Sequence, residues 1–301
     1  MDLKAYIRGK GRAVLEATLY PILSPTQFLS ISMLIKLGYW PNLKHPRTYN
    51  EKVVHTKLFR PHPLGPLVAD KRRVRQYVAE KGLKSILNGL LWVGTNPREI
   101  PFDTLPDQFV IKATHGSGWN LVVQNKNTLN RAEVVETCSR WLRLKYGQYS
   151  KRYEVHYDQI EPAIIIEEFL HDFEYGIPLD FKLYCFHGQP HYILVVTGRF
   201  VERSKSIYDT EWNLCPVEKG WPGKVDIPRP RQLERMLEVA AICSADFGAC
   251  RVDLYVPNDE RVVFGEITLT PSGGVEPFKP REWDFKLGSL WDLDAQKREQ
   301  A

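Results

Sequence analysis

Several features that mark secreted, membrane-spanning or metal-cluster proteins are scarce or missing in this sequence. Its five cysteines include no Cys-x-x-Cys pair, and scattered thiols of this kind are typical of a reducing cytoplasm. The start, Met-Asp-Leu-Lys, is followed by no apolar run, so we expect no signal peptide. The most apolar N-terminal stretch, residues 19–37, is interrupted by Pro21, Pro25 and Lys36 and falls short of the roughly 20 apolar residues of a membrane span. We therefore predict a cytoplasmic protein in which this stretch packs against the main body, with peripheral contact at the inner face of the membrane as the alternative.

Strong charge imbalance and internal repetition are also absent. The 41 Lys and Arg residues face 36 Asp and Glu residues, which gives a formal net charge of +5. That excess is too small for a nucleic-acid-binding surface, but it agrees with anionic ligands such as nucleotides or acidic sugars. With 301 residues, 43% of them hydrophobic, the chain is long enough for one or two domains with a substantial core.

The most informative stretch of the sequence runs from residue 109 to residue 123. Two apolar runs flank the small-residue loop 115–118, and this pattern predicts two strands joined by a tight turn whose backbone N–H groups can face an anion. Lys112 shares a strand face with Val110 and Thr114, so its amine is predicted to point towards whatever the loop covers. No Gly-Lys-Ser/Thr follows, so this is not a Walker loop. An ordinary hairpin with a surface lysine is the alternative.

Two later predicted strands carry charged residues. The apolar run 162–166 leads directly into Glu167 and Glu168, and adjacent strand residues point to opposite sides, so at most one carboxylate faces a given pocket. In the alternating stretch 179–186, Asp180 and Lys182 share one face. That pair is either a surface ion pair, worth about 0–1 kcal/mol, or a phosphate contact.

The stretches 250–256 and 261–268 predict a hairpin that gathers polar side chains. A two-residue turn at Asn258-Asp259 would place Arg251 opposite Glu266 and Asp253 opposite Phe264. Those charges would then form one patch together with Thr268.

Two neighbouring carboxylates repel each other unless a cation lies between them, and oxygen ligands without His or Cys suit Mg²⁺. The turn 270–274 follows at once, and its free N–H groups suit an anionic substrate group. A hairpin with scattered surface charges is the alternative.

Helical patterns surround these strands. Residues 1 to about 45 are predicted to be mostly helical, and Thr48 with Glu51 has the spacing of a capping box. Asp70 is predicted to cap a helix whose Lys71 and Arg75 lie one turn apart, by default on a solvated face. Further helices are predicted over 130–146 and 231–247.

Taken in this order, the pieces resemble the ATP-grasp superfamily and, more closely, the TupA-like ATP-grasp family of bacterial surface-polysaccharide (teichuronopeptide) biosynthesis. The resemblance implies an α+β fold in which two α/β lobes with antiparallel-rich sheets clasp ATP, preceded by a helical N-terminal segment. The domains expected are a helical segment 1–65, an ATP-grasp domain 66–292 with a lid lobe at about 107–165 and a metal-binding lobe at about 175–292, and a tail 293–301. The matching pieces are Arg47 to Lys52, Asp70-Lys71 with Val74-Arg75, Phe109 to Gly118, Ile166 to Glu168, Asp180 to Lys182 with Phe186, Arg251 to Asp253, and Gly265 to Thr268.

The resemblance also implies roles for single residues. Lys71 and Lys112 would hold the phosphates of ATP, residues 115–118 would form a mobile lid, and residues 166–170 would hold adenine, with Glu167 or Glu168 towards the ribose. The nucleotide-binding set is thus Lys71, Lys112, His115, Gly116, Ser117, Gly118, Glu167, Glu168, Phe169, Leu170 and Asp180. The metal set is Asp253, Glu266 and Thr268 for Mg²⁺. The catalytic set is Arg251, Lys182, Ser272 and Gly273, with Arg251 steadying the transferring phosphoryl group.

One metal residue departs from the ATP-grasp pattern. Thr268 stands where these enzymes commonly have Asn, and a hydroxyl is a weaker ligand than an amide carbonyl. The resemblance therefore leaves open whether one or two Mg²⁺ ions bind.

The chemistry that the resemblance implies is ATP- and Mg²⁺-dependent ligation of a carboxylate to an amine through an acyl phosphate. The substrates expected are an amino acid or other amine and a uronic acid or other carboxylate of a bacterial surface polysaccharide such as a capsule. Specificity is expected in the N-terminal segment and in the loop 199–223, whose Arg199, Arg203, Lys205 and Trp212 would meet an acidic sugar unless the loop is simply exposed. The alternatives are an ATP-dependent sugar kinase of the same fold, a glycosyltransferase that binds a nucleotide sugar, and a non-catalytic nucleotide-binding scaffold.

Overall fold

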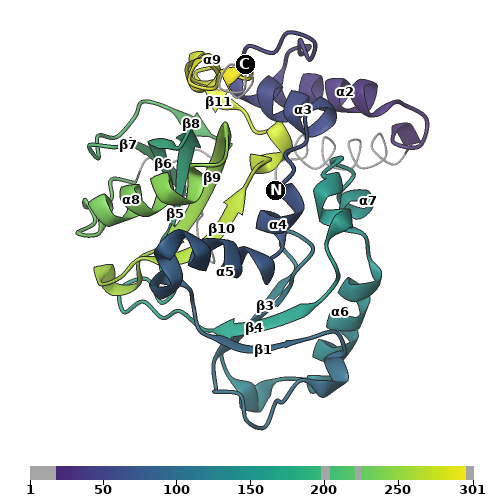
Figure 1. Cartoon of the computed structure of the whole chain (residues 1–301), viewed down its shortest axis with the longest axis vertical. Coiled ribbons are helices and arrows are strands. Elements are labelled where there is room, and N and C mark those ends of the chain that lie inside the picture. The colour runs from purple at the N-terminus through teal and green to yellow at the C-terminus, as the bar shows by residue number, and fades with distance from the viewer. Residues whose placement is uncertain (1–17, 198–203, 221–224, 296–301) are drawn as a thin grey trace, which may run out of the picture.

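A computed structural model of the chain describes residues 18–197, 204–220 and 225–295 (Figure 1). The strands are β1 (Leu90–Gly94), β2 (Phe109–Ala113), β3 (Asn120–Val123), β4 (Ile164–Glu168), β5 (Asp180–Phe186), β6 (Gln189–Thr197), β7 (Ser204–Asp209), β8 (Glu218–Lys219), β9 (Ala249–Tyr255), β10 (Val263–Thr268) and β11 (Phe278–Lys279). The α-helices are α2 (Pro25–Leu37), α3 (Tyr49–Phe59), α4 (Gly65–Ala69), α5 (Arg73–Val78), α6 (Arg131–Arg143), α7 (Tyr146–Ser150), α8 (Leu233–Ser244) and α9 (Glu282–Ser289).

Two antiparallel sheets form the framework of the described chain. The smaller sheet has the strand order β1-β4-β2-β3, and the larger one has the order β10-β9-β5-β6-β7. In Figure 1 the smaller sheet lies below the larger one, and α5 lies between them. The predicted α+β class with antiparallel sheets is confirmed.

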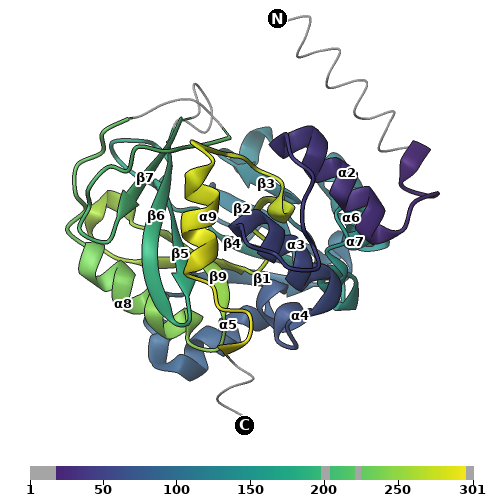
Figure 2. The same ribbon diagram turned by 90° about the horizontal axis from the view of Figure 1, so that it is seen from above.

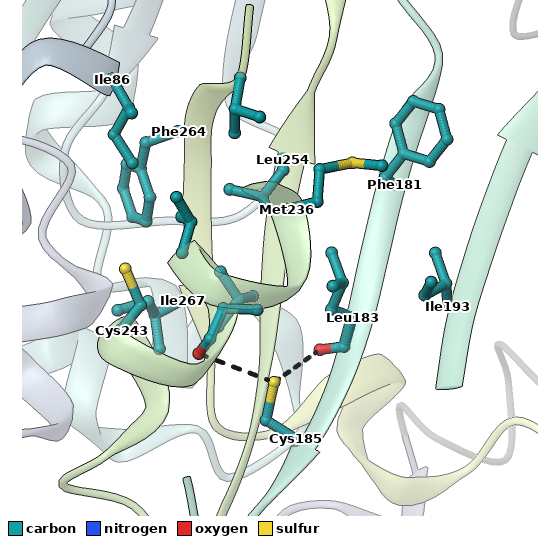
Figure 3. Packing of buried hydrophobic residues seen from close by; sticks show 14 of the residues in the cluster. Ile86, Phe181, Leu183, Cys185, Ile193, Met236, Cys243, Leu254, Phe264 and Ile267 are labelled. Carbon is teal, nitrogen blue, oxygen red and sulfur yellow. Dashed lines mark hydrogen bonds between the residues drawn. The ribbon is translucent and has the colours of Figure 1, made fainter. Parts of the chain in front are cut away.

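The larger sheet is covered on both faces because β5 alternates as predicted. Phe181, Leu183 and Cys185 are buried against α8, and Figure 3 shows the Cys185 thiol directed at the carbonyl oxygens of Leu183 and Ala240, 3.6 and 4.0 Å away. On the opposite face, Tyr184 belongs to a cluster that α3 and α9 complete. This second face is the one that also carries the polar side chains of β5.

The smaller sheet has a core of its own. Phe109, Ile111 and Ile166 are fully buried and pack with Trp141 of α6. The helix is shorter than the predicted 130–146, but Asn130 caps it as expected, since its side chain accepts the N–H of Glu133 at 3.3 Å.

Helices α2 and α3 pack on the body, as the sequence predicted, whereas residues 1–17 of the predicted helical segment lie outside the described residues. Thr48 and Glu51 form the expected capping box, in which each side chain accepts the backbone N–H of the other residue at 3.1 Å. Helix α2 buries Phe28, Leu29 and Met33 beside α3 (Figure 2). Among the described residues, no helix combines the length and the apolar character that crossing a membrane would require.

The prediction of an exposed loop over residues 199–223 is largely wrong, because two strands lie within this range. Residues 204–209 form β7 at the edge of the larger sheet, and β8 pairs with β11, more than fifty residues later in the chain. Lys205 forms an ion pair with Glu276, and Trp212 stacks on Tyr208 with ring centroids 4.2 Å apart. Both side chains thus contribute to the fold, whereas Arg199 and Arg203 lie outside the described residues.

Candidate active site

The lysine of the informative stretch is held by a carboxylate on the neighbouring strand. Strand β2 pairs with β4 so that Lys112 faces Ile165 and Val110 faces Glu167, which puts Lys112 and Glu167 on one sheet face. Lys112 Nζ lies 2.5 Å from Glu167 Oε2, and Arg75 Nη1 lies 3.0 Å from Glu167 Oε1. Glu167 is buried, so its carboxylate serves as the counter-ion for two cations.

A cavity of about 410 Å³ opens beside Lys112. Its lining includes Glu168, Phe169 and Leu170 of the predicted adenine-binding segment, and Tyr255 from the end of β9 contributes from the larger sheet. Glu168, rather than Glu167, is the acid of this segment that lines the cavity. Both lobes therefore contribute to one space that is large enough for a nucleotide base and ribose.

The predicted lid loop has a buried half and an exposed half. His115 is buried, with its Nε2 3.0 Å from the carbonyl oxygen of Trp141, and burial lowers its pKa. A Cβ atom on Gly116 would lie 2.5 Å from the Trp119 ring, so only glycine fits this position. Ser117 and Gly118 are exposed, and Gly118 has a φ of 75°.

Lys71 is not on a solvated face. Its amine donates to the carbonyl oxygen of Gly116, and its backbone N–H donates to Thr114. Burial lowers the pKa of Lys71 to about 8, the charges of Glu266 and Glu167 oppose this shift, and the charge of Lys112 adds to it. Lys71 thus lies within electrostatic reach of Lys112 in one lobe and of Glu266 in the other.

The acidic hairpin has a different register from the predicted one. Glu266 pairs with Asp253 and Thr268 pairs with Arg251, which is two residues away from the expected pairing. The connection is longer than a two-residue turn, and a bulge at Gly265 shifts the register within β10. The predicted patch is nevertheless present, because a shift of two residues keeps every side chain on its face.

Arg251 connects the polar side chains of this patch. Its Nε and Nη2 donate to both carboxylate oxygens of Asp253 at 2.6 and 2.8 Å, and Nη2 also lies 3.2 Å from Glu266 Oε1 and 3.3 Å from Thr268 Oγ1. Lys182 forms ion pairs with Asp253 and, at 2.8 Å, with Asp180. The like-faced Asp180–Lys182 pair is therefore buried beside the acids rather than on the surface.

The charges of the patch shift one another's proton affinity. Burial raises the pKa of Asp253 to about 6, and Arg251 and Lys182 oppose this shift. Burial also acts to raise the pKa of Glu266, but Arg251, Lys182, the hydroxyl of Thr268 and Lys71 outweigh it and bring the pKa to about 2. Glu266 keeps 43% of its side-chain surface open, so its ionised carboxylate is accessible.

The donor chemistry of the patch fits Mg²⁺. Asp253 and Glu266 are cross-strand neighbours, and Thr268 donates to Glu266 Oε1 at 2.7 Å. No group of three or more His, Cys, Asp or Glu side chains suited to a metal occurs within the described ranges. Two carboxylates are what Mg²⁺ commonly takes from a protein when substrate phosphates complete its shell.

The turn after β10 lies beside a further charged cluster. Ser272 donates to Glu276 Oε2 at 2.7 Å, and Glu276 also pairs with Lys205. The carbonyl oxygen of Gly273 accepts from Lys57 Nζ at 2.9 Å. Of the two predicted catalytic residues in this turn, Ser272 is thus held by Glu276, just before β11, and Gly273 by Lys57 of α3. Lys205 of β7 in turn holds Glu276.

Sequence reasoning missed several residues that shape the site. Arg75 was placed on a solvated face, although it binds Glu167, and Tyr255 was taken only as part of a strand. Asn88 fixes the adenine-binding segment, because its side chain donates to the carbonyl oxygen of Glu168 at 2.8 Å. Only Arg75 had a usable signal, its position one turn after Lys71.

With this geometry established, comparison with known proteins settles the family. Residues 51–291 match the family described as TupA-like ATPgrasp. The chain belongs to the TupA-like ATP-grasp family. A search of curated proteins finds no match to the chain.

The solved structures to which this TupA-like chain is similar are only distantly so. D-alanine–D-alanine ligase from Bacillus anthracis with ATP is 16% identical, with a TM-score of 0.40 over 67% of this chain and 54% of that one. N5-carboxyaminoimidazole synthetase from Staphylococcus aureus with ADP is 12% identical, with a TM-score of 0.43 over 67% and 45%. L-amino acid ligase from Bacillus licheniformis is 12% identical, with a TM-score of 0.46 over 75% and 50%. The TupA-like chain spans about half the length of these three proteins.

Proposed function

We propose that this protein is an ATP- and Mg²⁺-dependent carboxylate–amine ligase that forms an amide through an acyl phosphate. The observation that carries the proposal is the convergence of two lobes on one site. Lys112, Glu168 and Tyr255 line a single cavity, and Lys71 lies within electrostatic reach of both Lys112 and Glu266. This convergence supports a site in which the cations would hold phosphates and the carboxylates would hold a metal ion.

In the proposed reaction, a carboxylate oxygen attacks the γ-phosphorus of ATP while the bond to ADP breaks. The amine nitrogen then attacks the acyl carbon, phosphate leaves, and the nitrogen loses a proton. Lys71 and Lys112 would neutralise phosphate charge, and Arg251 would stabilise the transferring phosphoryl group. Mg²⁺ held by Asp253 and Glu266 would supply further charge neutralisation. The catalysis is mainly positioning, so no activated Ser or Cys is needed.

The substrates we propose are an amino acid or other amine and a uronic acid or other carboxylate of bacterial surface-polysaccharide biosynthesis. Support comes from the family match and from the mildly basic composition, which favours acidic substrates. We also propose cytoplasmic action and the domain limits 1–65, 66–292 and 293–301.

The glycosyltransferase alternative would call for a metal-binding Asp-x-Asp motif, which many such enzymes use. The chain contains this triplet at Asp292 to Asp294. Asp292 Oδ1 accepts the N–H of Asp294 at 2.9 Å, and Asp294 forms an ion pair with Arg60. These contacts cap a turn, so the triplet does not favour a glycosyltransferase.

The deciding experiment measures ADP release across pairs of carboxylates and amines. A ligase releases ADP fully only when both substrates are present, and the product is an amide. ADP release with a sugar alone, together with a phosphate ester product, would instead establish the kinase.

Two substitutions test the assigned residues. Glu266→Gln should keep the fold and lower turnover by at least about 100-fold, because a group that neutralises transition-state charge is lost. Lys112→Ala should weaken ATP binding by about tenfold or more, since it removes a charge-assisted contact. Glu136→Gln, an exposed change on α6, is the matched control and should leave both quantities unchanged. Normal turnover in Glu266→Gln would refute the metal assignment.

A further inference from the structure

Arg75 lies on a helix that packs against one sheet, but its side chain binds the other sheet. Its neighbours on α5, Val74, Tyr77 and Val78, are buried in the core of the larger sheet. The guanidinium group of Arg75 contacts the smaller sheet, since Nη1 lies 3.0 Å from Oε1 of Glu167 on β4. Figure 1 shows α5 between the two sheets. Arg75 therefore ties the carboxylate of Glu167 to the core of the larger sheet.

The other oxygen of the same carboxylate holds a lysine that lines the cavity of about 410 Å³, which we call the nucleotide cavity. Glu167 Oε2 lies 2.5 Å from Lys112 Nζ, so each carboxylate oxygen has its own cation. Glu167 and Arg75 expose 10% and 17% of their side-chain surface, and Lys112 exposes 26%. Two cations thus share one largely buried carboxylate, and the more exposed cation is the one at the cavity.

A phosphate group that enters the nucleotide cavity has to compete with Glu167 for the amine of Lys112. If the amine moves to the phosphate, it leaves the carboxylate, and a buried carboxylate without a partner is strongly unfavourable. Arg75 removes most of this cost, because it stays on Oε1 of Glu167 while Oε2 is released. Arginine suits this task because it is always protonated, and a second contact, from Nη2 to the carbonyl oxygen of Asn88 at 2.6 Å, fixes the guanidinium group.

We propose that Arg75 is a positioning residue for ATP binding, which keeps Glu167 paired so that Lys112 is available to a phosphate. The inference rests on the proposed nucleotide site and extends it to a residue that does not line the nucleotide cavity. Glu167 is then the resting counter-ion that holds the amine of Lys112 until a phosphate replaces it.

The proposal gives Arg75 an effect on ATP that depends on Glu167. Without the arginine, Lys112 and Glu167 would form a neutral pair, and ATP would bind only by breaking that pair and leaving the carboxylate alone. Without both the arginine and the carboxylate, Lys112 would again be available to the phosphate. An arginine that only stabilised the fold, or one that contacted the phosphate itself, would show no such dependence.

The test measures the Kd of ATP with Mg²⁺ by calorimetry on the full chain, without a carboxylate or amine substrate. Arg75→Gln removes the charge but can still donate to the carbonyl oxygen of Asn88, so ATP affinity should fall by about tenfold or more. Arg75→Lys keeps a cation for Oε1 of Glu167 and should stay within about threefold of the wild type. Arg73→Gln on the same helix and Arg143→Gln at the end of α6 remove exposed arginines, and both should leave the Kd unchanged.

The decisive protein carries Arg75→Gln together with Glu167→Gln. Removing the carboxylate should restore ATP affinity to within about threefold of the wild type. If Arg75→Gln alone does not fold, the double variant is compared with Glu167→Gln, and equal affinities are expected.

The outcomes separate this inference from the proposed ligation. Wild-type affinity in Arg75→Gln, or a tenfold loss that persists in the double variant, would overturn the role of Arg75 and leave the proposed ligation intact. A wild-type chain that binds no ATP would refute the proposed function and this inference together.

Discussion

Lys219 is a cation enclosed by aromatic rings. Only 1% of its surface is exposed, and its Nζ lies 3.7 Å from the centroid of Phe278 and 5.7 Å from that of Tyr184. Within the described part of the chain, Nζ has no hydrogen-bond partner. Burial lowers its pKa to about 8, and the charges of Glu276 and Asp284 oppose the shift. Burial of such an amine should therefore show in the pH dependence of stability.

The first prediction concerns Lys219→Met. The pKa of an unfolded lysine is about 10.4, so between about pH 8 and pH 10 the unfolded chain binds more protons at this residue than the folded chain. The free energy of unfolding of the wild type should then rise with pH relative to the Lys219→Met variant, by about 2–3 kcal/mol over this range. Urea unfolding of both proteins at several pH values measures this difference in the free energy of unfolding.

The comparison with a variant is needed because Lys57 and Lys71 also have pKa values lowered to about 8. Lys84→Met, at an exposed position, is the control and should follow the wild type across the range. Parallel pH profiles for the wild type and Lys219→Met would show that the amine is not perturbed by burial.

At the scale of elements, the sequence predicted the polar hairpin but not its pairing. The alternation of Arg251, Asp253 and Glu266 with apolar residues determines which face each side chain occupies, and that is a local property. The register depends on the connection and on the bulge at Gly265, which form through contacts between strands. A turn pair such as Asn258-Asp259 does not report those contacts.

The second prediction concerns Gly265→Ala. A Cβ atom there would lie 2.8 Å from the carbonyl oxygen of Asp253 and 3.0 Å from the ring of Tyr255. The strands would have to separate at the bulge, so we expect a loss of about 1–3 kcal/mol in the free energy of unfolding. ATP affinity should fall as well, because Tyr255 lines the nucleotide cavity. Denaturant unfolding and nucleotide titration measure the two effects.

Gly38→Ala separates steric contact from the general cost of replacing glycine. Gly38 has a φ of 80°, and nothing lies within 4 Å of an added Cβ atom. Its replacement should cost about 1 kcal/mol and leave ATP affinity unchanged. An unchanged ATP affinity in Gly265→Ala would mean that the bulge does not position Tyr255.

At the scale of the whole molecule, the strands and helices that the sequence predicted correctly were those with strong local patterns. The strands around Lys112 and Asp180 and the capped helices were recognisable because alternation and capping are encoded within a few residues. Strand β8 was missed because its two residues are stabilised only by β11, and the role of Arg75 depends on a partner ninety-two residues away. Long-range contacts of this kind leave no local signal.

The last prediction concerns how much a nucleotide bound between the two lobes raises the stability of the folded protein. ATP with Mg²⁺ would bind the folded chain only, so at about 100 times its Kd it should add roughly 2.7 kcal/mol of stability. For a chain of 301 residues that corresponds to a rise of about 4 °C in Tm. The shift should be smaller with ADP, absent with UDP-sugars and reduced in Lys112→Ala, while Arg143→Gln should retain it. A larger shift with a UDP-sugar than with ATP would favour the glycosyltransferase. No shift with any nucleotide would mean that the cavity lined by Lys112 and Tyr255 is not a nucleotide site, and the convergence of the two sheets would need another explanation.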